Sequence, residues 1–152
     1  MRVMKNIFKQ ASVSLMMLLV TITTASAAGK AAQSKASGFN WNPVMDAIIQ
    51  VESGGNTKAV SGNSVGAMQI TPILVKECNT ILQKRKSSKR YSMADRYNVA
   101  KSKEMFLLIQ SYHNPQNNVE KAIRTWNGGP KYSVRATNRY FKKVMSKLKQ
   151  SA

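Results

Sequence analysis

Apolar residues recur at helical spacing in several separate stretches of the chain, which predicts a mainly helical protein. Between the first two stretches, the segment from Gly54 to Gly66 is rich in glycine, serine and asparagine, and it is predicted to hold a short hairpin. The sequence contains no internal repeat and no long alternating strand. We therefore expect a single α+β domain that is predominantly α-helical. The predicted helices cover residues 42–51, 71–82, 95–111, 119–126 and 136–148.

The first predicted helix has clear start and stop signals. Asn42 can cap it, and Pro43 suits its first position because a first-turn residue has no use for the N–H that proline lacks. Its apolar residues lie on nearly all sides, so we expect the helix to be buried. It runs directly into Glu52 and a glycine-rich break.

The first 27 residues have the pattern of a secretory signal peptide. Basic residues precede an apolar stretch from Ala11 to Val20, and the small-x-small sequence Ala25-Ser26-Ala27 follows. The apolar stretch is short for a bilayer crossing, which takes about 20 residues. We expect cleavage after Ala27, with an uncleaved N-terminal anchor as the alternative.

The expected domain organisation follows from this signal. Residues 28–40 are rich in alanine, glycine, serine and lysine, which is typical of a flexible leader. The folded domain is then expected over residues 41–150. Export would place it in the periplasm or outside the cell, and we expect a monomer.

The net charge limits the classes of partner. The chain has 24 Lys and Arg against 6 Asp and Glu, and loss of residues 1–27 would take its formal charge from +18 to +15. Export and the lack of interleaved aromatic residues argue against nucleic acid. The densest basic run, Lys84-Arg85-Lys86, is interpreted as a solvated loop. The alternative is peripheral contact with an anionic envelope surface.

The inventory of reactive residues excludes several kinds of site. A single cysteine, Cys78, rules out a disulfide framework, and a single histidine, His113, argues against a multi-histidine metal site and a Ser-His-Asp triad. We expect Cys78 to be a buried small hydrophobe and His113 a surface residue in a loop. The sequence has neither a phosphate-binding loop nor metal-ligand spacing, so neither a metal nor a cofactor is expected.

Glu52 stands in an unfavourable place for a structural acid. It follows an apolar helix directly, where the negative end of the helix dipole disfavours a carboxylate. If apolar walls surround it, the pKa of its carboxyl rises, as a general acid near neutral pH requires. The alternative is an exposed glutamate at a frayed helix end.

Four short motifs occur in order along the chain and resemble the soluble lytic transglycosylase family of the lysozyme-like superfamily. The resemblance covers about residues 41–145, and its final helix resembles the family's closing helix. The motifs are Glu52-Ser53, Gly66-Ala67-Met68-Gln69, Asp95-Arg96-Tyr97-Asn98-Val99 and Thr125-Trp126-Asn127-Gly128-Gly129-Pro130.

This resemblance implies a lysozyme-like fold and cleavage of the bond between N-acetylmuramic acid and N-acetylglucosamine in peptidoglycan glycan strands. The family's glutamate protonates the glycosidic oxygen and then accepts the proton of the muramic acid 6-hydroxyl, which leaves a 1,6-anhydro end. By resemblance, Glu52 takes this role. The spacing does not decide between two serines for the family's site serine. The implied substrate-binding residues are Ser61 or Ser64, Gly66, Met68, Gln69, Trp126 and Asn127.

The acids near Glu52 favour a mechanism with one carboxylate. Ordinary glycosidases place two carboxyl groups across the bond. The nearest acid in sequence is Asp46, whose side chain would lie ~240° around the helix and ~9 Å along it. Asp46 and Glu52 therefore cannot flank one sugar, although a distant acid could still fold in.

Trp126 departs from the family pattern, which has tyrosine before the asparagine. An indole N–H can donate but not accept a hydrogen bond, so Trp126 either stacks on a sugar or packs in the core. Asn127 could instead cap a helix, and Met68 could belong to the core. The rival functions are a muramidase that uses water and a non-catalytic cationic protein that binds peptidoglycan.

Overall fold

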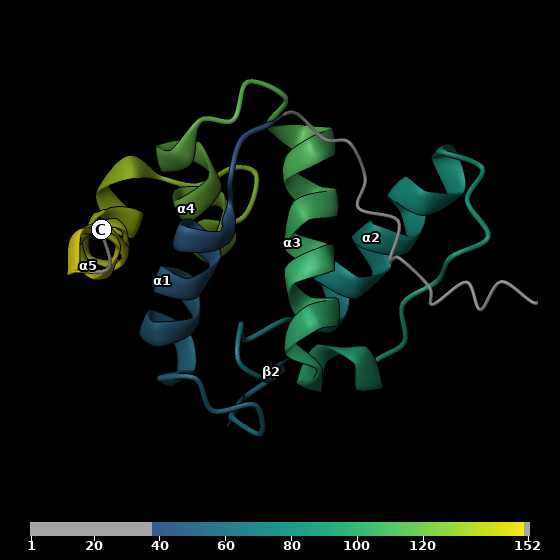
Figure 1. Cartoon of the computed structure of the whole chain (residues 1–152), viewed down its shortest axis with the longest axis horizontal. Coiled ribbons are helices and arrows are strands. Elements are labelled where there is room, and N and C mark those ends of the chain that lie inside the picture. The colour runs from purple at the N-terminus through teal and green to yellow at the C-terminus, as the bar shows by residue number, and fades with distance from the viewer. Residues whose placement is uncertain (1–37, 151–152) are drawn as a thin grey trace, which may run out of the picture. The chain divides into compact units, whose positions relative to one another are not determined.

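The computed structural model describes residues 38–150, which fall within one compact unit of the chain. The expected signal peptide and nearly all of the expected leader lie outside these residues. Figure 1 shows the order of the elements along the chain. They are α1 (Asn42–Ser53), β1 (Val60–Ser61), β2 (Ser64–Val65), α2 (Pro72–Lys84), the 3-10 helix η1 (Ala94–Tyr97), α3 (Val99–His113), α4 (Val119–Gly128) and α5 (Val134–Gln150).

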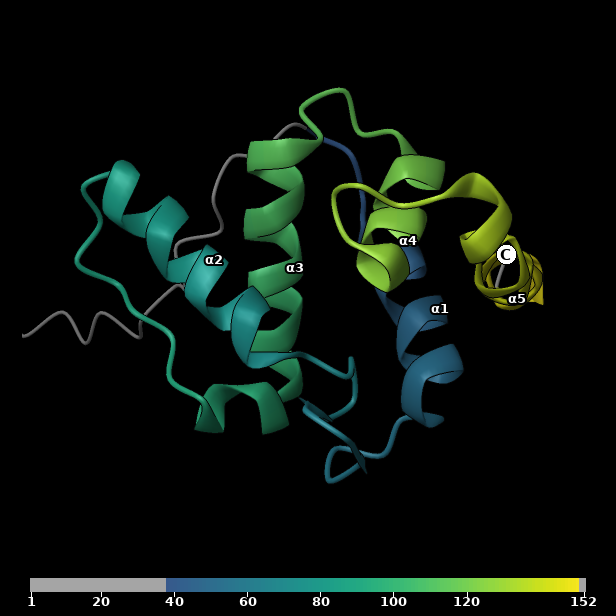
Figure 2. The same ribbon diagram turned by 180° about the vertical axis from the view of Figure 1, so that it is seen from behind.

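The α3 helix lies between two groups of helices. Figures 1 and 2 show α2 on one side of it and α1, α4 and α5 on the other. Side chains from both sides are buried in one core, including Ile48 of α1, Cys78 of α2, Phe106 of α3 and Ile123 of α4. Each such residue stabilises the fold by about 1.5–3 kcal/mol. The shared core fixes α1 and α4 relative to α3. Within residues 38–150, none of the helices combines the length and the apolar character that a membrane crossing needs.

Each predicted helical stretch is helical in the structure, but several of the predicted boundaries differ. The α2 helix begins as predicted, and the Thr71 hydroxyl accepts a hydrogen bond from the Leu74 N–H at 3.2 Å. The N-cap of α1 is Trp41 and not Asn42, so that prediction was wrong by one residue. Trp41 is buried, and its ring meets Phe106 edge-on at a centroid distance of 5.6 Å. Core packing therefore decides where the chain enters this helix.

The predicted helix over residues 95–111 is two elements in the structure. Asn98 has an extended backbone, and its side-chain oxygen accepts a hydrogen bond from the Lys101 N–H at 3.0 Å. It thereby ends η1 and caps α3, because a short polar side chain competes with the helical backbone bonds. The α3 helix then runs to His113, which is its last residue and not part of the following loop.

The predicted hairpin between Gly54 and Gly66 is confirmed. Its two short strands pair antiparallel, with Val60 opposite Val65 and Ser61 opposite Ser64. A further isolated bridge joins Val65 to Ile70. The turn that carries the second motif is therefore tied to the hairpin through its backbone.

Gly66 is required at the end of the hairpin. Its φ of +78° is in the left-handed region, and its N–H donates to the Ala59 carbonyl at 2.8 Å. A Cβ at this position would lie 2.0 Å from the carbonyl oxygen of Arg96 in η1. The Arg96 guanidinium in turn donates to the Asn63 carbonyl at 3.1 Å. The hairpin and η1 thus touch backbone to backbone, and a side chain between them would push them apart.

A buried arginine fastens α5 to α4. Arg124 pairs with Glu120 at 2.6 Å and donates to the Val134 carbonyl and the Thr137 hydroxyl, at 3.0 and 3.1 Å. Its guanidinium carbon lies 4.3 Å from the centre of the Phe141 ring. Because the guanidinium meets one carboxylate and two further oxygen acceptors, its buried positive charge is compensated. This joint sets how the rest of α5 approaches α1.

Candidate active site

Glu52 is the residue before the last in α1, and its carboxyl group is half-buried. Gly54, two residues after Glu52, has a left-handed conformation at φ +61° and caps the end of the helix. Burial disfavours the charged form, and it raises the pKa of Glu52 above the ordinary value of 4.5. The environment that the sequence predicts for this acid is therefore present.

A tyrosine from the other end of the chain contacts this carboxyl. The Tyr140 hydroxyl, on α5, donates a hydrogen bond to Glu52 Oε1 at 2.7 Å. This bond favours the carboxylate and partly offsets the effect of burial on the pKa of Glu52. Burial and the nearby Glu52 raise the pKa of Tyr140, so its phenol stays protonated and remains a donor. Glu52 and Tyr140 form a matched acceptor and donor.

The first motif is bonded directly to the second. The Ser53 hydroxyl donates to the Ala67 carbonyl at 2.8 Å, and the same oxygen accepts the Gly55 N–H at 3.2 Å. The serine beside Glu52 thus holds the end of α1 against the turn at Gly66–Gln69.

The turn at Gly66–Gln69 is held mainly by Gln69. Its backbone is left-handed at φ +51°, and its side-chain amide donates to the carbonyls of Gly66 and Ala59 at 2.9 and 3.3 Å. The side chain of Met68 is fully buried in the core. That placement favours the packing interpretation of Met68, because no part of its side chain reaches solvent.

The third motif is bonded to the second through Trp126. Its indole N–H donates to the Met68 carbonyl at 3.3 Å, and its ring packs on Phe106 at a centroid distance of 5.2 Å. Asn127 is exposed in the last turn of α4, which continues to Gly128 and is capped by Gly129. The helix ends two residues later than predicted, so Asn127 does not cap it.

A groove of about 430 Å³ opens beside Trp126. It lies between the start of α2, the end of α3 and the end of α4. Glu52 does not line it. Trp126 thus both bonds to the second motif and lines the groove. The polar and aromatic residues that line the groove include Glu77, Gln110, His113, Lys121, Trp126 and Asn127.

The two candidate serines face each other on the hairpin. Ser61 is exposed and Ser64 is half-buried. Neither hydroxyl makes a hydrogen bond to Glu52 within the part of the chain that the structure describes. The choice between Ser61 and Ser64 stays open.

The other five acids of the chain all have partners away from Glu52. Glu77 and Glu120 belong to pairs at the groove and at the contact between α4 and α5, Asp46 is exposed, and Asp95 and Glu104 are half-buried. The contacts are Asp46 with Lys103 at 2.6 Å, Glu77 with His113 at 2.9 Å, Asp95 with the Ser92 N–H at 2.7 Å, Glu104 with Lys89 at 2.6 Å, and Glu120 with Arg124 at 2.6 Å. Glu52 is thus the one acid whose carboxyl is bonded to Tyr140.

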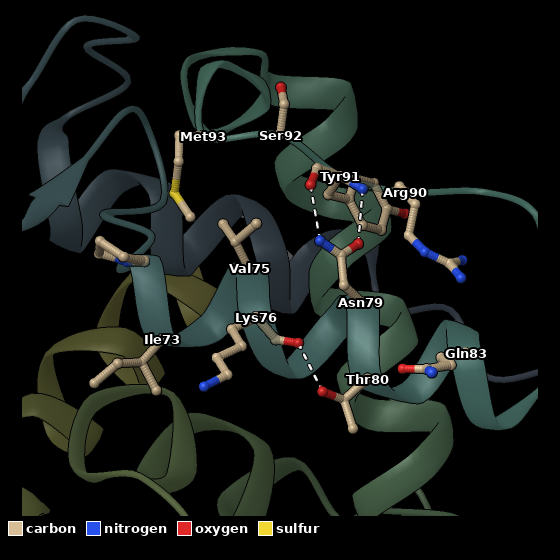
Figure 3. A pocket seen from close by; sticks show the side chains of 11 residues that line it. Ile73, Val75, Lys76, Asn79, Thr80, Gln83, Arg90, Tyr91, Ser92 and Met93 are labelled. Carbon is tan, nitrogen blue, oxygen red and sulfur yellow. Dashed lines mark hydrogen bonds between the residues drawn. The ribbon is translucent and has the colours of Figure 1, made fainter.

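A second, more open pocket of about 660 Å³ lies across α2 (Figure 3). The Asn79 side chain donates to the Tyr91 carbonyl and accepts from the Tyr91 N–H, both at 2.8 Å. The residues that line this pocket include Lys76 and Arg90 but no acid. It lacks the proton donor that cleavage of a glycosidic bond needs, so it is not the candidate active site.

Cys78 and His113 are placed as predicted, apart from the helical position of His113. The Cys78 thiol is fully buried, and burial raises its pKa to about 12. It therefore stays protonated and unreactive. His113 is exposed and bonded to Glu77. Over residues 38–150 there is no group of three His, Cys, Asp or Glu side chains that could hold a metal ion.

Tyr140 is the site residue that the sequence did not identify. It belongs to the final helix that resembles the family's closing helix, but it was not among the predicted site residues. The signal that could have found it is the missing phenol at Trp126, since a buried acid needs a donor from somewhere. Helical spacing alone places Tyr140 on the inner face but does not say what it meets.

Comparison with known proteins adds one finding. A family model described as the transglycosylase SLT domain matches residues 26–151. No curated protein matches the chain, and no solved structure does.

Proposed function

We propose that this chain, which belongs to the transglycosylase SLT domain family, uses Glu52 as its only acid and base in cleaving peptidoglycan. Membership of the family makes the protein a lytic transglycosylase with peptidoglycan as its substrate. The proposal concerns the catalytic residue and the product. Cleavage between N-acetylmuramic acid and N-acetylglucosamine would leave 1,6-anhydro-muramoyl ends.

In the first step, protonated Glu52 gives its proton to the glycosidic oxygen, and the bond to C1 of the muramic acid breaks. The raised pKa supports this role because it keeps a fraction of the carboxyl protonated nearer neutral pH. In the second step, the Glu52 carboxylate accepts the proton of the 6-hydroxyl while that oxygen bonds to C1. Glu52 then holds a proton again, and no water is consumed.

Tyr140 supports the second step. Its hydroxyl donates to Glu52 Oε1, so it stabilises the carboxylate that forms when the proton leaves. It also leaves Oε2 available to the sugar. We assign Tyr140 as a positioning residue that acts through Glu52. It supplies the phenol that the family pattern has before the asparagine and that Trp126 replaces here.

The observation that carries this proposal is the isolation of one half-buried carboxyl from the other five acids. Two-carboxylate glycosidases hold the groups about 5–9.5 Å apart across the bond. Here the remaining acids pair elsewhere, so an internal nucleophile, the 6-hydroxyl, replaces the second carboxylate. The groove beside Trp126 and Asn127 would accommodate sugars next to the cleaved bond.

Mass spectrometry of the muropeptides released by the purified protein tests the product. Anhydro-muramoyl ends are expected. Reducing muramic acid ends would instead indicate a muramidase that uses water. Binding to peptidoglycan without release of muropeptides would indicate the non-catalytic cationic protein that Trp126 and the net charge left open.

Replacing Tyr140 with phenylalanine should shift the alkaline limb of the activity profile to higher pH. The substitution removes the hydrogen bond that lowers the pKa of Glu52 and leaves the burial that raises it. Glu52 would then hold its proton to a higher pH. The measurement is kcat/KM against pH for both proteins.

The neighbouring Phe141 provides the control for this prediction. It packs on Arg124 and has no hydroxyl that could donate to the carboxyl, so Phe141→Leu should leave the pH of the alkaline limb unchanged even if the rate falls. If the alkaline limb of Tyr140→Phe lies at the same pH as that of the wild type, Tyr140 does not act as a positioning residue for Glu52.

A further inference from the structure

The outer side of α5 carries six basic residues, here named the α5 cationic face. At ~100° per residue they occupy an arc of ~160° around the helix, and the opposite arc holds Tyr140, Val144 and Leu148 against the core. All six side chains are exposed. The face consists of Arg135, Arg139, Lys142, Lys143, Lys147 and Lys149.

Five of these six cations have no acidic partner among residues 38–150. The chain has no Asp or Glu after Glu120, and the six acids all lie on other elements. Lys147 reaches the Gln150 side chain at 3.4 Å. The other five cations make no hydrogen bond or ion pair through their side chains among the described residues. The positive charge of these five side chains is therefore available to an external anion.

The most obvious basic run in the sequence behaves differently. Lys84 bonds to the Tyr112 hydroxyl at 3.2 Å, and Arg85 bonds to Ser111 at 3.1 Å and lies over the Tyr112 ring. Nearby, Lys89 pairs with Glu104 at 2.6 Å. These cations are engaged with α3, so the loop is a weaker candidate for an external partner than α5.

We propose that the α5 cationic face docks on the phosphate headgroups of an anionic lipid bilayer. The charges lie on the convex side of a helix about 25 Å long. No α5 residue lines either of the two pockets described above. A convex cationic surface matches a plane of anionic charge better than it matches a single glycan or peptide strand, which needs a groove.

The mode of binding follows from the other face of the helix. The apolar arc of α5 is already packed against α1 and α4 and cannot enter the lipid. Contact is therefore electrostatic and peripheral, and salt screens it. Tyr140 lies on the inner arc, so docking holds Glu52 roughly one helix diameter, about 10 Å, behind the membrane-facing side.

Sedimentation of the full chain with vesicles tests this proposal. The wild type should bind phosphatidylglycerol vesicles at about 0.05 M salt, release them at about 0.5 M, and bind phosphatidylcholine vesicles weakly. The quadruple change Arg135→Gln, Arg139→Gln, Lys142→Gln and Lys143→Gln should lower the salt-sensitive partition coefficient by about 10²–10³-fold. Each cation at an anionic surface contributes about fivefold.

A matched control removes the same charge from the other side of the unit. Figures 1 and 2 show α5 and α2 at opposite sides of α3. The control variant carries Lys76→Gln, Lys84→Gln, Lys86→Gln and Arg90→Gln. Its partition coefficient should stay within a few-fold of the wild-type value. Equal losses in the two variants would mean that net charge matters and the α5 face does not, which overturns the proposal.

Two further measurements separate other occupants and misfolding. The α5 variant should keep the wild-type melting temperature, because its changed side chains contact solvent. Salt-dependent binding to purified peptidoglycan and to duplex DNA is measured for the same proteins. If the α5 variant loses either of these and keeps its binding to phosphatidylglycerol, the face serves that polymer and the lipid proposal is wrong.

Discussion

Glu52→Gln should reduce the release of anhydro-muropeptides by at least 10²–10⁴-fold, which is about the effect of losing one general acid or base. The loss should lie at or above the upper end because one group would serve both steps. Glutamine keeps the size of the side chain and can still accept the hydrogen bond from Tyr140. It cannot give or take the proton. Muropeptide release by purified protein measures the effect.

The same variant should be as stable as the wild type or more stable at neutral pH. The folded state raises the pKa of Glu52, so folding is favoured at low pH and penalised as pH rises from the unfolded pKa through the folded one. Glutamine removes this penalty. The melting temperature of Glu52→Gln should therefore exceed that of the wild type most clearly above the folded pKa of Glu52, and the difference should shrink below about pH 4.

Asp46→Asn is the matched control for Glu52→Gln. Asp46 is on the same helix, is exposed, and pairs with Lys103. Its loss should leave the rate largely intact, because an exposed ion pair contributes little. Wild-type rates in Glu52→Gln would show that the site and the mechanism are wrong.

Gly66→Ala should lower the free energy of unfolding by about 2–5 kcal/mol. Alanine at a left-handed φ costs about 1–2 kcal/mol, and forcing a methyl group into filled space costs about 1–3 kcal/mol more. The new Cβ would lie 2.0 Å from the Arg96 carbonyl oxygen, which belongs to the backbone and cannot rotate away. Urea unfolding followed by circular dichroism gives the value.

Gly62→Ala separates the two causes of this loss. Gly62 has a similar φ of +56°, but a Cβ there would meet nothing within 4 Å. It should therefore lose only about 1–2 kcal/mol. If Gly62→Ala and Gly66→Ala lose the same amount, the contact between the hairpin and η1 does not matter. Activity should fall in Gly66→Ala alone, because the displaced turn is bonded to Ser53 beside Glu52.

Local patterns were sufficient for the positions of most elements. Thr71-Pro72 marks the start of α2 and does so in the structure. A helix start depends on a side chain a few residues away, so it can be read from neighbouring letters. The wrong predictions concern places where two structural preferences compete for the same stretch of chain. Asn98 divides a continuous apolar pattern, and Trp41 displaces Asn42 as the cap because its ring is needed in the core.

Local order marked Glu52 as a candidate acid, and the resemblance of four motifs to a known family was needed to select it. Glu52 stands between an apolar helix and a glycine-rich turn, and both features lie within a few residues of it. The raised pKa of the carboxyl agrees with that expectation. The donor that meets it, however, lies 88 residues further along the chain. No local pattern specifies which inward-facing residue of α5 will reach the end of α1.

The sequence by itself thus determined the helical class and the hairpin, because each depends on contacts between near neighbours, and its ordered motifs singled out Glu52 as the candidate acid. The tertiary structure alone decided that Tyr140 meets Glu52, that Met68 is in the core, and that Gly66 touches Arg96. It also decided which cations face outward unpaired by acids. These outcomes depend on how α1, α4 and α5 pack together, and packing joins residues whose separation along the chain carries no local signal.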